Sequence, residues 1–464
     1  HFQIAFSGFR TAIEMFRKAH GSNHPLLSNL MVHASTQYED ISFGLVHWFP
    51  DHTASRTALE HSLTLRDASI ARLCRAMVGS DTYDKRQIMN TCVVDNNALV
   101  SLCQLVTGRG GVLRQLGRVE EAKDIFMDAV ELTYRLEAGE GFPVWRGPGK
   151  GQRGGLEELL LREPEVENHD DDPFYVPKKE DLGRDPEELA ECRARIARAG
   201  EAMGDARGIL VNMTVDQPLA MECIFSVAQC VYMLGQLEDA EAILECLLAF
   251  NEATEQTDTP LAGLVLNALA GILLTLAPTL ESEMKDKKLL RAEGLLHRAL
   301  LAREDMYGTT HPLTCNIMYN IAVCSHLQEK WIPAGKMAEQ CLDLREKKFG
   351  ECSIEVASCL YLIADTLRAQ NAYRVKHQYH VGGGGDDEGS HGEDGGGNSS
   401  KGGGGGGSDS DEESTTKKLD VPYPMEEDED WAVKLTARAD AILRTIREMK
   451  LPDSHQLDEI ITAV

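Results

Sequence analysis

Two consecutive stretches of this sequence share one pattern: residues 292–322 are AEGLLHRALLAREDMYGTTHPLTCNIMYNIA, and residues 334–364 are AGKMAEQCLDLREKKFGECSIEVASCLYLIA. Six residues of the first stretch recur 42 positions later, as Ala292/Ala334, Arg303/Arg345, Glu304/Glu346, Gly308/Gly350, Tyr319/Tyr361 and Ala322/Ala364. A fixed period of this size is typical of stacked supersecondary units. The repeat therefore predicts an extended array whose units mainly provide surface, and it argues against a domain that closes around one core.

Small residues inside the repeat indicate two antiparallel helices joined by a tight turn. A glycine precedes an alanine by five positions in residues 235–240 and again in residues 117–122. In the 42-residue repeat these two positions hold Glu329 and Ala334, and Ala322 lies on the preceding helix. Glycine permits the turn, while alanine on each helix allows the two helices to approach closely.

The connection between units is also specific. After Arg303 and Glu304 the chain reads Gly-Thr-Thr-His-Pro at residues 308–312, and the same loop type occurs at residues 21–25. Glycine ends one helix and proline opens the next at its first turn. These features resemble the tetratricopeptide family, and the 42-residue period is most similar to the kinesin-light-chain type of repeat. The resemblance implies an all-α fold, an α-solenoid of helical hairpins wound into a superhelix.

The hydrophobic pattern and composition divide the chain into five parts. We expect N-terminal helical hairpins over 1–136, a Gly-rich and then acidic, Pro-rich linker or insertion over 137–188, repeats over 189–380, a Gly-rich, acidic and Ser-rich insertion over 381–430, and closing helices over 431–464. The fourth part has too few apolar residues to offset its chain entropy, so it is predicted to be disordered. The segment from Trp431 to Ala439 resembles the second helix of a repeat.

Composition limits the partners. The net charge of −27 argues against nucleic acid or an anionic membrane, because phosphate neutralisation needs clustered Lys and Arg. Residues 261–277 lie in the longest uncharged stretch, and we interpret them as a buried first helix of a repeat. Twelve cysteines without a Cys-x-x-Cys pair indicate reduced thiols, so a cytoplasmic location is expected.

No segment carries a complete catalytic or metal-binding motif. The Gly-rich residues 147–155 include Lys150 but lack the Ser or Thr that a phosphate-binding loop needs. Residues 169–172 (His-Asp-Asp-Asp) lack the rest of a calcium loop, and His47 and His52 have no third ligand at metal spacing. The sequence therefore predicts a non-enzyme without cofactor or metal.

The predicted function is peptide binding. In the tetratricopeptide family, first helices line a concave face that holds peptide segments of other proteins, often through Asn side chains. That resemblance assigns peptide-binding roles to Asn267, Tyr319 and Asn320. Equivalent positions hold Ser226, Ala268 and Leu362, so the family's preference for acidic peptides is not carried over. We also expect phosphorylation at Ser408 and Ser410, which precede acidic residues.

Two alternatives stay open at this point. The chain begins with His rather than Met, so it could be the repeat region of a signalling NTPase or methyltransferase whose catalytic domain lies upstream. It could also be a cargo adaptor of true kinesin-light-chain kind, which would require an upstream heptad coiled coil. Neither the partner nor the oligomeric state follows from these residues.

Overall fold

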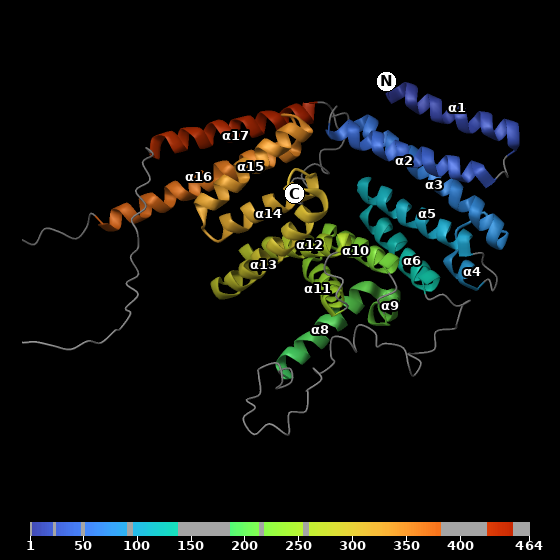
Figure 1. Ribbon diagram of the computed structural model, residues 1–464, viewed down its shortest axis with the longest axis horizontal. Helices are drawn as coiled ribbons and strands as arrows, with labels where there is room; N and C mark the ends of the chain where they lie inside the picture. The colour runs from blue at the N-terminus through green and yellow to red at the C-terminus, as the bar shows by residue number, and fades with distance from the viewer. Residues whose placement is uncertain are drawn as a thin grey trace, which may run out of the picture.

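The computed structural model describes residues 2–21, 25–47, 52–90, 96–137, 186–212, 218–253, 259–381 and 425–448. Within these ranges all regular structure is helical and no strand occurs (Figure 1). The all-α prediction is confirmed. Most of the proposed linker, most of the acidic Gly-rich tract with Ser408 and Ser410, and the final residues after 448 lie outside the described ranges.

Most helices pair into antiparallel hairpins, and all but the last of these pairs have a short connection in the sequence. The pairs are α2 (Pro25–His47) with α3 (His52–Val78), α5 (Asn96–Gln115) with α6 (Val119–Glu137), α10 (Pro218–Met233) with α11 (Leu237–Ala253), α12 (Pro260–Leu276) with α13 (Ser282–Tyr307), α14 (Pro312–Leu327) with α15 (Trp331–Phe349), and α16 (Ile354–Val381) with α17 (Met425–Glu448). The 42-residue echo therefore corresponds to one helical hairpin.

Successive hairpins stack in the same way along the array. The second helix of each hairpin packs against the first helix of the next: α3 against α5, α6 against α10, α11 against α12, α13 against α14, and α15 against α16. The first helices α10, α12, α14 and α16 also contact one another in that order. This repeated contact pattern is that of an α-solenoid, in which each unit touches mainly its neighbours.

Other helices stand outside this succession. Helix α1 (Phe2–His20) packs on α2, and α4 (Lys85–Asn90) contacts α3. Helix α8 (Pro186–Met203), the 3₁₀ turn η2 (Gly204–Ala206) and α9 (Arg207–Asn212) form an inserted unit, and α8 lies against α11. A further 3₁₀ turn, η3 (Ala277–Thr279), connects α12 to α13 where Pro278 interrupts the repeat.

Three of the hairpin turns have a left-handed backbone. Gly117 and Gly235 have φ values of 77° and 78°, and Glu329 has the same type of conformation with φ 62°. Among the described residues Glu329 is the single non-glycine residue with positive φ. A left-handed conformation costs an ordinary L-residue roughly 1–2 kcal/mol. The repeat pattern thus correctly placed Glu329 at the turn, where glycine is the favoured residue.

Replacing Glu329 by glycine should therefore stabilise the protein. The relief of backbone strain exceeds the added freedom of glycine in the unfolded chain, so we expect about 0.5–1 kcal/mol of net gain. Thermal or denaturant unfolding measures this change. The matched control is Glu339→Gly in exposed helical backbone of α15, which should lose about 1 kcal/mol. Equal losses in both variants would contradict the turn argument.

The loop between units is fixed by its own side chains. Gly308, with φ 81°, ends α13, and its N–H donates to the Glu304 carbonyl at 2.9 Å. His311 caps α14 because its Nδ1 accepts from the Leu313 N–H at 3.2 Å, and Thr314 donates to the Gly308 carbonyl at 2.9 Å. One repeat later, Gly350 and Ser353 occupy corresponding positions, and the Ser353 hydroxyl accepts from Val356 N–H.

Helix α12 is the apolar stretch that the sequence places inside a repeat. The segment Pro260–Thr279 is the one described helix long and apolar enough to cross a membrane, and 61% of that window is buried within the protein. Helices α11, α13 and α14 pack around it. It is therefore accounted for as a core helix of the array.

Helix α17 closes the described array beside α16 (Figure 1). It begins at Met425, earlier than the expected start at Trp431, and α8 likewise begins at Pro186, inside the segment expected as linker. Acidic residues of the 425–430 stretch suit a helix N-terminus, where the dipole favours negative charge. Asp428 also pairs with Arg374 of α16 at 3.0 Å. The sequence analysis placed residues 425–430 in the acidic insertion because of their charge composition alone.

Candidate inner groove

The three residues predicted to bind peptide line one cavity on the first-helix side of the array. This cavity, the inner groove, has a volume of about 610 Å³. Its lining residues come mainly from α10, α12 and α14, with Leu244 from α11, Arg345 from α15 and Glu355 from α16. Apolar walls are provided by Leu244, Ile272, Leu274, Val323 and Leu327. Pockets of roughly 300–1,000 Å³ with apolar walls and a few polar groups are typical ligand sites.

Asn267 and Asn320 form an amide pair across the groove. The Asn320 Nδ2 donates to Asn267 Oδ1 at 3.0 Å, which joins α14 to α12, and both side chains are half-buried. A primary amide has two N–H donors and two acceptor lone pairs, so this single bond leaves further donors and acceptors on each. The sequence placed the two residues one position apart in their repeats, and the structure brings them into contact.

Tyr319 lines the same groove but is mostly part of its wall. Its residue exposure is only 9%, and the Arg345 guanidinium carbon lies 4.4 Å from the centre of its ring. Burial raises the pKa of the Tyr319 hydroxyl above its usual value. Tyr319 therefore belongs to the wall of the groove, and its capacity for direct peptide contact is small in this conformation.

Arg345 organises the C-terminal end of the groove. One of its terminal nitrogens donates to the Glu355 carbonyl at 2.8 Å and to Ser358 Oγ at 2.9 Å, while the other donates to Asn316 Oδ1 at 3.1 Å. The side chain is 2% exposed. It thereby ties α15 to both α14 and α16.

Sequence reasoning did not assign Asn316, Arg345 or Gln229 to the groove, although all three line it. Asn316 could have been found because it precedes Asn320 by one helical turn and shares its face. Arg345 repeats Arg303 after 42 residues, so the sequence shows that the position recurs. It does not show that the Arg345 side chain points into the groove wall. Gln229 receives a hydrogen bond from Arg114 of α5, a contact between distant parts of the sequence.

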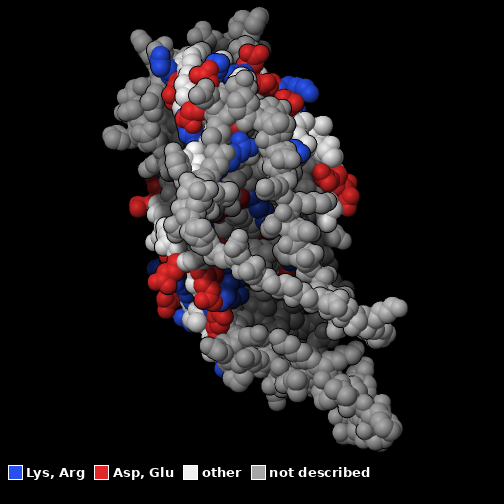
Figure 2. Space-filling view, turned by 90° about the vertical axis from the view of Figure 1, so that its left-hand side faces the viewer, with Lys and Arg blue, Asp and Glu red and all other residues white. Residues whose placement is uncertain are grey.

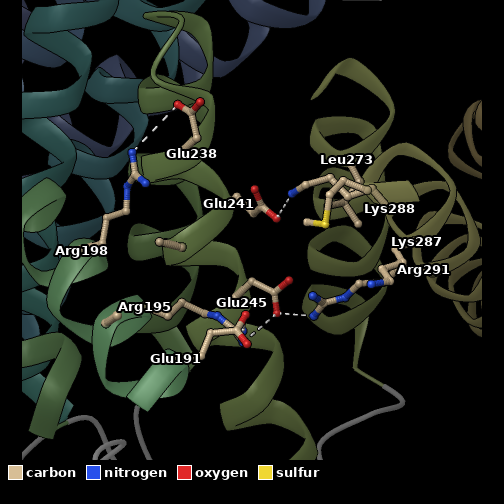
Figure 3. Close-up of a pocket in the computed structure, with 13 residues that line it drawn as sticks. Glu191, Arg195, Arg198, Glu238, Glu241, Glu245, Leu273, Lys287, Lys288 and Arg291 are labelled. Atoms are coloured by element: carbon tan, nitrogen blue, oxygen red, sulfur yellow. Dashed lines mark hydrogen bonds and ion pairs between the residues drawn. The ribbon is translucent and has the colours of Figure 1, made fainter. Parts of the chain in front are cut away.

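A second hollow lies on the outer side, between α8, α11 and α13 (Figure 3). Helix α11 contributes a row of carboxylates that face cations of both neighbours: Lys288 pairs with Glu241 at 2.6 Å, and Arg291 pairs with Glu245 at 2.5 Å. From α8, Arg195 reaches Glu245 at 3.5 Å. Burial raises the pKa of Glu245, which is 4% exposed. These mutual pairs connect the inserted helix α8 to the array, and we assign them a structural role.

A third hollow of about 640 Å³ lies between α2, α3 and α5. Arg66 and Arg72 line it together with neutral side chains, and Arg66 is held by Glu39 at 2.7 Å. Gly108 of α5 leaves room for Arg66, because an added Cβ would lie 2.1 Å from the present position of the guanidinium. Arg66 is therefore a buried arginine between neighbouring helices at this end of the array, as Arg345 is at the other end.

The described surface has charges of both signs. On the face shown in Figure 2, basic and acidic side chains are interspersed, and no large field of either sign stands out among the coloured atoms. Within the described residues no group of three or more His, Cys, Asp or Glu could hold a metal ion. Residues 147–155, residues 169–172, Ser408 and Ser410 lie outside those ranges, as do the His47 and His52 side chains.

Comparison with solved structures finds repeat proteins of similar architecture. The crystal structure of BtubC (BKLC) from P. vanneervenii aligns with a TM-score of 0.38 and 13% identity, over 73% of this chain and 99% of that chain. A Podosopora anserina putative kinesin light chain with nearly identical TPR-like repeats gives a TM-score of 0.30 and 14% identity, over 43% of this chain and 93% of that chain. A singly substituted form of that Podosopora anserina protein gives a TM-score of 0.30 and 15% identity, over 42% of this chain and 92% of that chain.

This chain is a solenoid of tetratricopeptide-like hairpins. No protein-family model matches it, and no curated protein matches it either. The fold follows from the hairpins, their turns and their repeated stacking.

Proposed function

We propose that this chain is a non-catalytic, cytoplasmic protein-interaction scaffold whose inner groove binds a peptide segment of a partner protein. The Asn267–Asn320 amide pair is the observation that carries the proposal, because it places polar groups between apolar walls. The two amides can exchange the hydrogen bond between them for hydrogen bonds to a peptide backbone. The apolar walls can then accept the side chains of the peptide. The eleven described cysteines are free thiols, which supports a reducing compartment.

The charge of the groove favours a peptide with few charges over the bound length. Its lining contains one cation, Arg345, and one carboxylate, Glu355, whereas its other polar groups are neutral. Arg345 is already engaged with Asn316 and with α16, so its guanidinium acts chiefly as part of the wall. Backbone hydrogen bonds and apolar contacts would then dominate recognition.

A double substitution of Asn267→Ala and Asn320→Ala tests the groove. Both amides are removed together, so neither remains buried without its partner. A peptide selected from a random library on the wild-type chain should bind the double variant at least roughly tenfold more weakly, as expected for two lost hydrogen bonds. Isothermal titration calorimetry gives the dissociation constants.

The control is Gln340→Ala, which removes an exposed amide from the outer helix α15. Circular dichroism should show equal helicity for all three proteins. Equal affinity of the wild type and the double variant would place the peptide site elsewhere. A substitution of Tyr319 would not test binding alone, because its ring packs against Arg345 and its removal would disturb the hairpin.

A further inference from the structure

Two cysteines face each other where α14 and α15 cross. Cys315 Sγ lies 3.8 Å from the Cys341 carbonyl oxygen, and Cys341 Sγ lies 3.7 Å from the Cys315 carbonyl oxygen. Each thiol therefore points at the backbone of the other residue. Such reciprocal contacts require a close approach of the two backbones, which is also the condition for a disulfide without large backbone movement.

In the two neighbouring hairpins the position of this pair is filled by the smallest residues. By the repeat register, the equivalent pair is Gly263 with Ala299 in the preceding hairpin and Ala357 with Ala439 in the following one. These residues are all buried. Small side chains therefore meet at the crossing in these three hairpins, and in the α14–α15 hairpin alone both of them are thiols.

We infer that Cys315 and Cys341 form a modification site, an oxidisable thiol pair that closes to a disulfide between α14 and α15 in response to a hydroperoxide. Cys315 adjoins the groove residue Asn316, and both thiols lie beside the Arg345 side chain that forms the groove wall. The cross-link would covalently fix the two helices at the C-terminal end of the inner groove. The thiol pair itself does not depend on peptide binding there.

The chemistry balances with the peroxide as oxidant. The Cys315 thiolate attacks one peroxide oxygen, the O–O bond breaks, and the leaving hydroxide takes a proton to become water. Cys341 then attacks the Cys315 sulfenic acid sulfur, the S–S bond forms, and the S–O bond breaks. The departing hydroxide takes the Cys341 proton as a second water. Two thiols are oxidised and one hydroperoxide is reduced.

The surroundings of the pair assign the first step to Cys315. A hydrogen bond from the Cys341 thiol lowers the pKa of Cys315, and the Arg345 guanidinium acts in the same direction against the effect of burial. The hydrogen bond with Cys315 and burial raise the pKa of Cys341. Cys324, on the same helix as Cys315, has a pKa raised by burial to about 12. Because thiolates are the reactive form, Cys315 should react before Cys324.

Peptide mass spectrometry tests the inference. The folded full chain is treated with hydrogen peroxide, free thiols are alkylated, and the protein is digested with trypsin without reduction. The tryptic peptide of residues 304–330 holds both Cys315 and Cys324, whereas that of residues 337–345 holds Cys341. We expect these two peptides to be linked in the wild type and in Cys324→Ala, and unlinked in Cys315→Ala. Dithiothreitol should release them.

The variants are expected to fold, because Ala357 occupies the position equivalent to Cys315, and Ala299 and Ala439 occupy the position equivalent to Cys341. Cys341→Ala supplies a second readout, since it should leave a sulfenic acid on Cys315 that dimedone captures. The inference is overturned if Cys315 and Cys341 stay reduced while the exposed Cys352 is fully oxidised. It is equally overturned if the linked peptides appear only in protein oxidised in guanidinium chloride.

Discussion

Replacing Arg345 by methionine should lower the free energy of unfolding by about 2–4 kcal/mol. The buried guanidinium makes three hydrogen bonds to oxygen acceptors on α14 and α16, and it stacks on the Tyr319 ring. Hydrogen bonds to charged groups contribute roughly 1.5–3 kcal/mol each. Part of that sum is offset, because the methionine variant does not bury a charge that lacks a counter-ion. In addition, Asn316 is exposed and can bind water in place of the guanidinium.

Lysine at the same position should recover less than half of the loss. It keeps the charge but lacks the planar fork that reaches two helices at once. Urea unfolding followed by circular dichroism measures both variants. The control is Arg298→Met on α13, whose partner Glu252 lies at 2.8 Å with both side chains nearly half-exposed, so a change of about 0.2–1 kcal/mol is expected. If Arg345→Met behaves like Arg298→Met, the guanidinium is not a tie between repeats.

Arg303 and Arg345 illustrate which features of the fold the sequence predicts and which it does not. Their 42-residue spacing identified them as part of the repeat, and both are buried at 2% exposure. Their partners differ, however: Arg303 donates to the Pro260 carbonyl within its own hairpin, whereas Arg345 reaches across to α16. Gly263 leaves room for Arg303, because an added Cβ would lie 2.9 Å from its Nε. A periodic pattern finds equivalent positions but not the local packing that gives each one its partner.

For the inner groove, too, the sequence predicts which residues occupy equivalent positions but not which residues contact one another. Asn267 and Asn320 were assigned to the first-helix face, which the 3.6-residue helical period determines. The bond between them depends on how α12 and α14 stack, which the helical period does not determine. Tyr319 is adjacent to Asn320 in sequence, yet it turns into the wall because adjacent helical residues point in different directions. Sequence alone could not separate lining residues from those supporting them.

The inserted helix α8 could not be placed from sequence. Its pattern is amphipathic, which predicts burial of one face without naming the surface that covers it. In the structure it contacts α11 through ion pairs such as Arg198 with Asp239 at 2.8 Å, while α6 and α10 pack directly together. The sequence treated the region from residue 189 as the start of the regular repeats. The regular succession instead passes from α6 to α10, and α8 lies against its side.

Ala322→Leu and Ala334→Leu should each cost about 1–3 kcal/mol, because they enlarge side chains in the closely packed α14–α15 hairpin. Both alanines have 0% exposure. Ala322 belongs to a core cluster with Cys315, Ala338 and Cys341, the residues that bring the two helices together. A leucine there forces either an unfavourable rotamer or a shift of the helix, since interiors are packed to crystal-like density.

The combined variant decides whether these alanines act in one crossing. If one outward shift of α15 relieves both clashes, the double variant should lose less than the sum of the single losses. Unfolding in urea, monitored by circular dichroism, gives the three free energies. Ala437→Leu, at an exposed position of α17, provides the control, where a change within about 0.5 kcal/mol is expected. Unchanged stability of both single variants would mean that alanine does not set the helix spacing, and the small-residue rule behind the repeat and the Cys315–Cys341 pair would fail together.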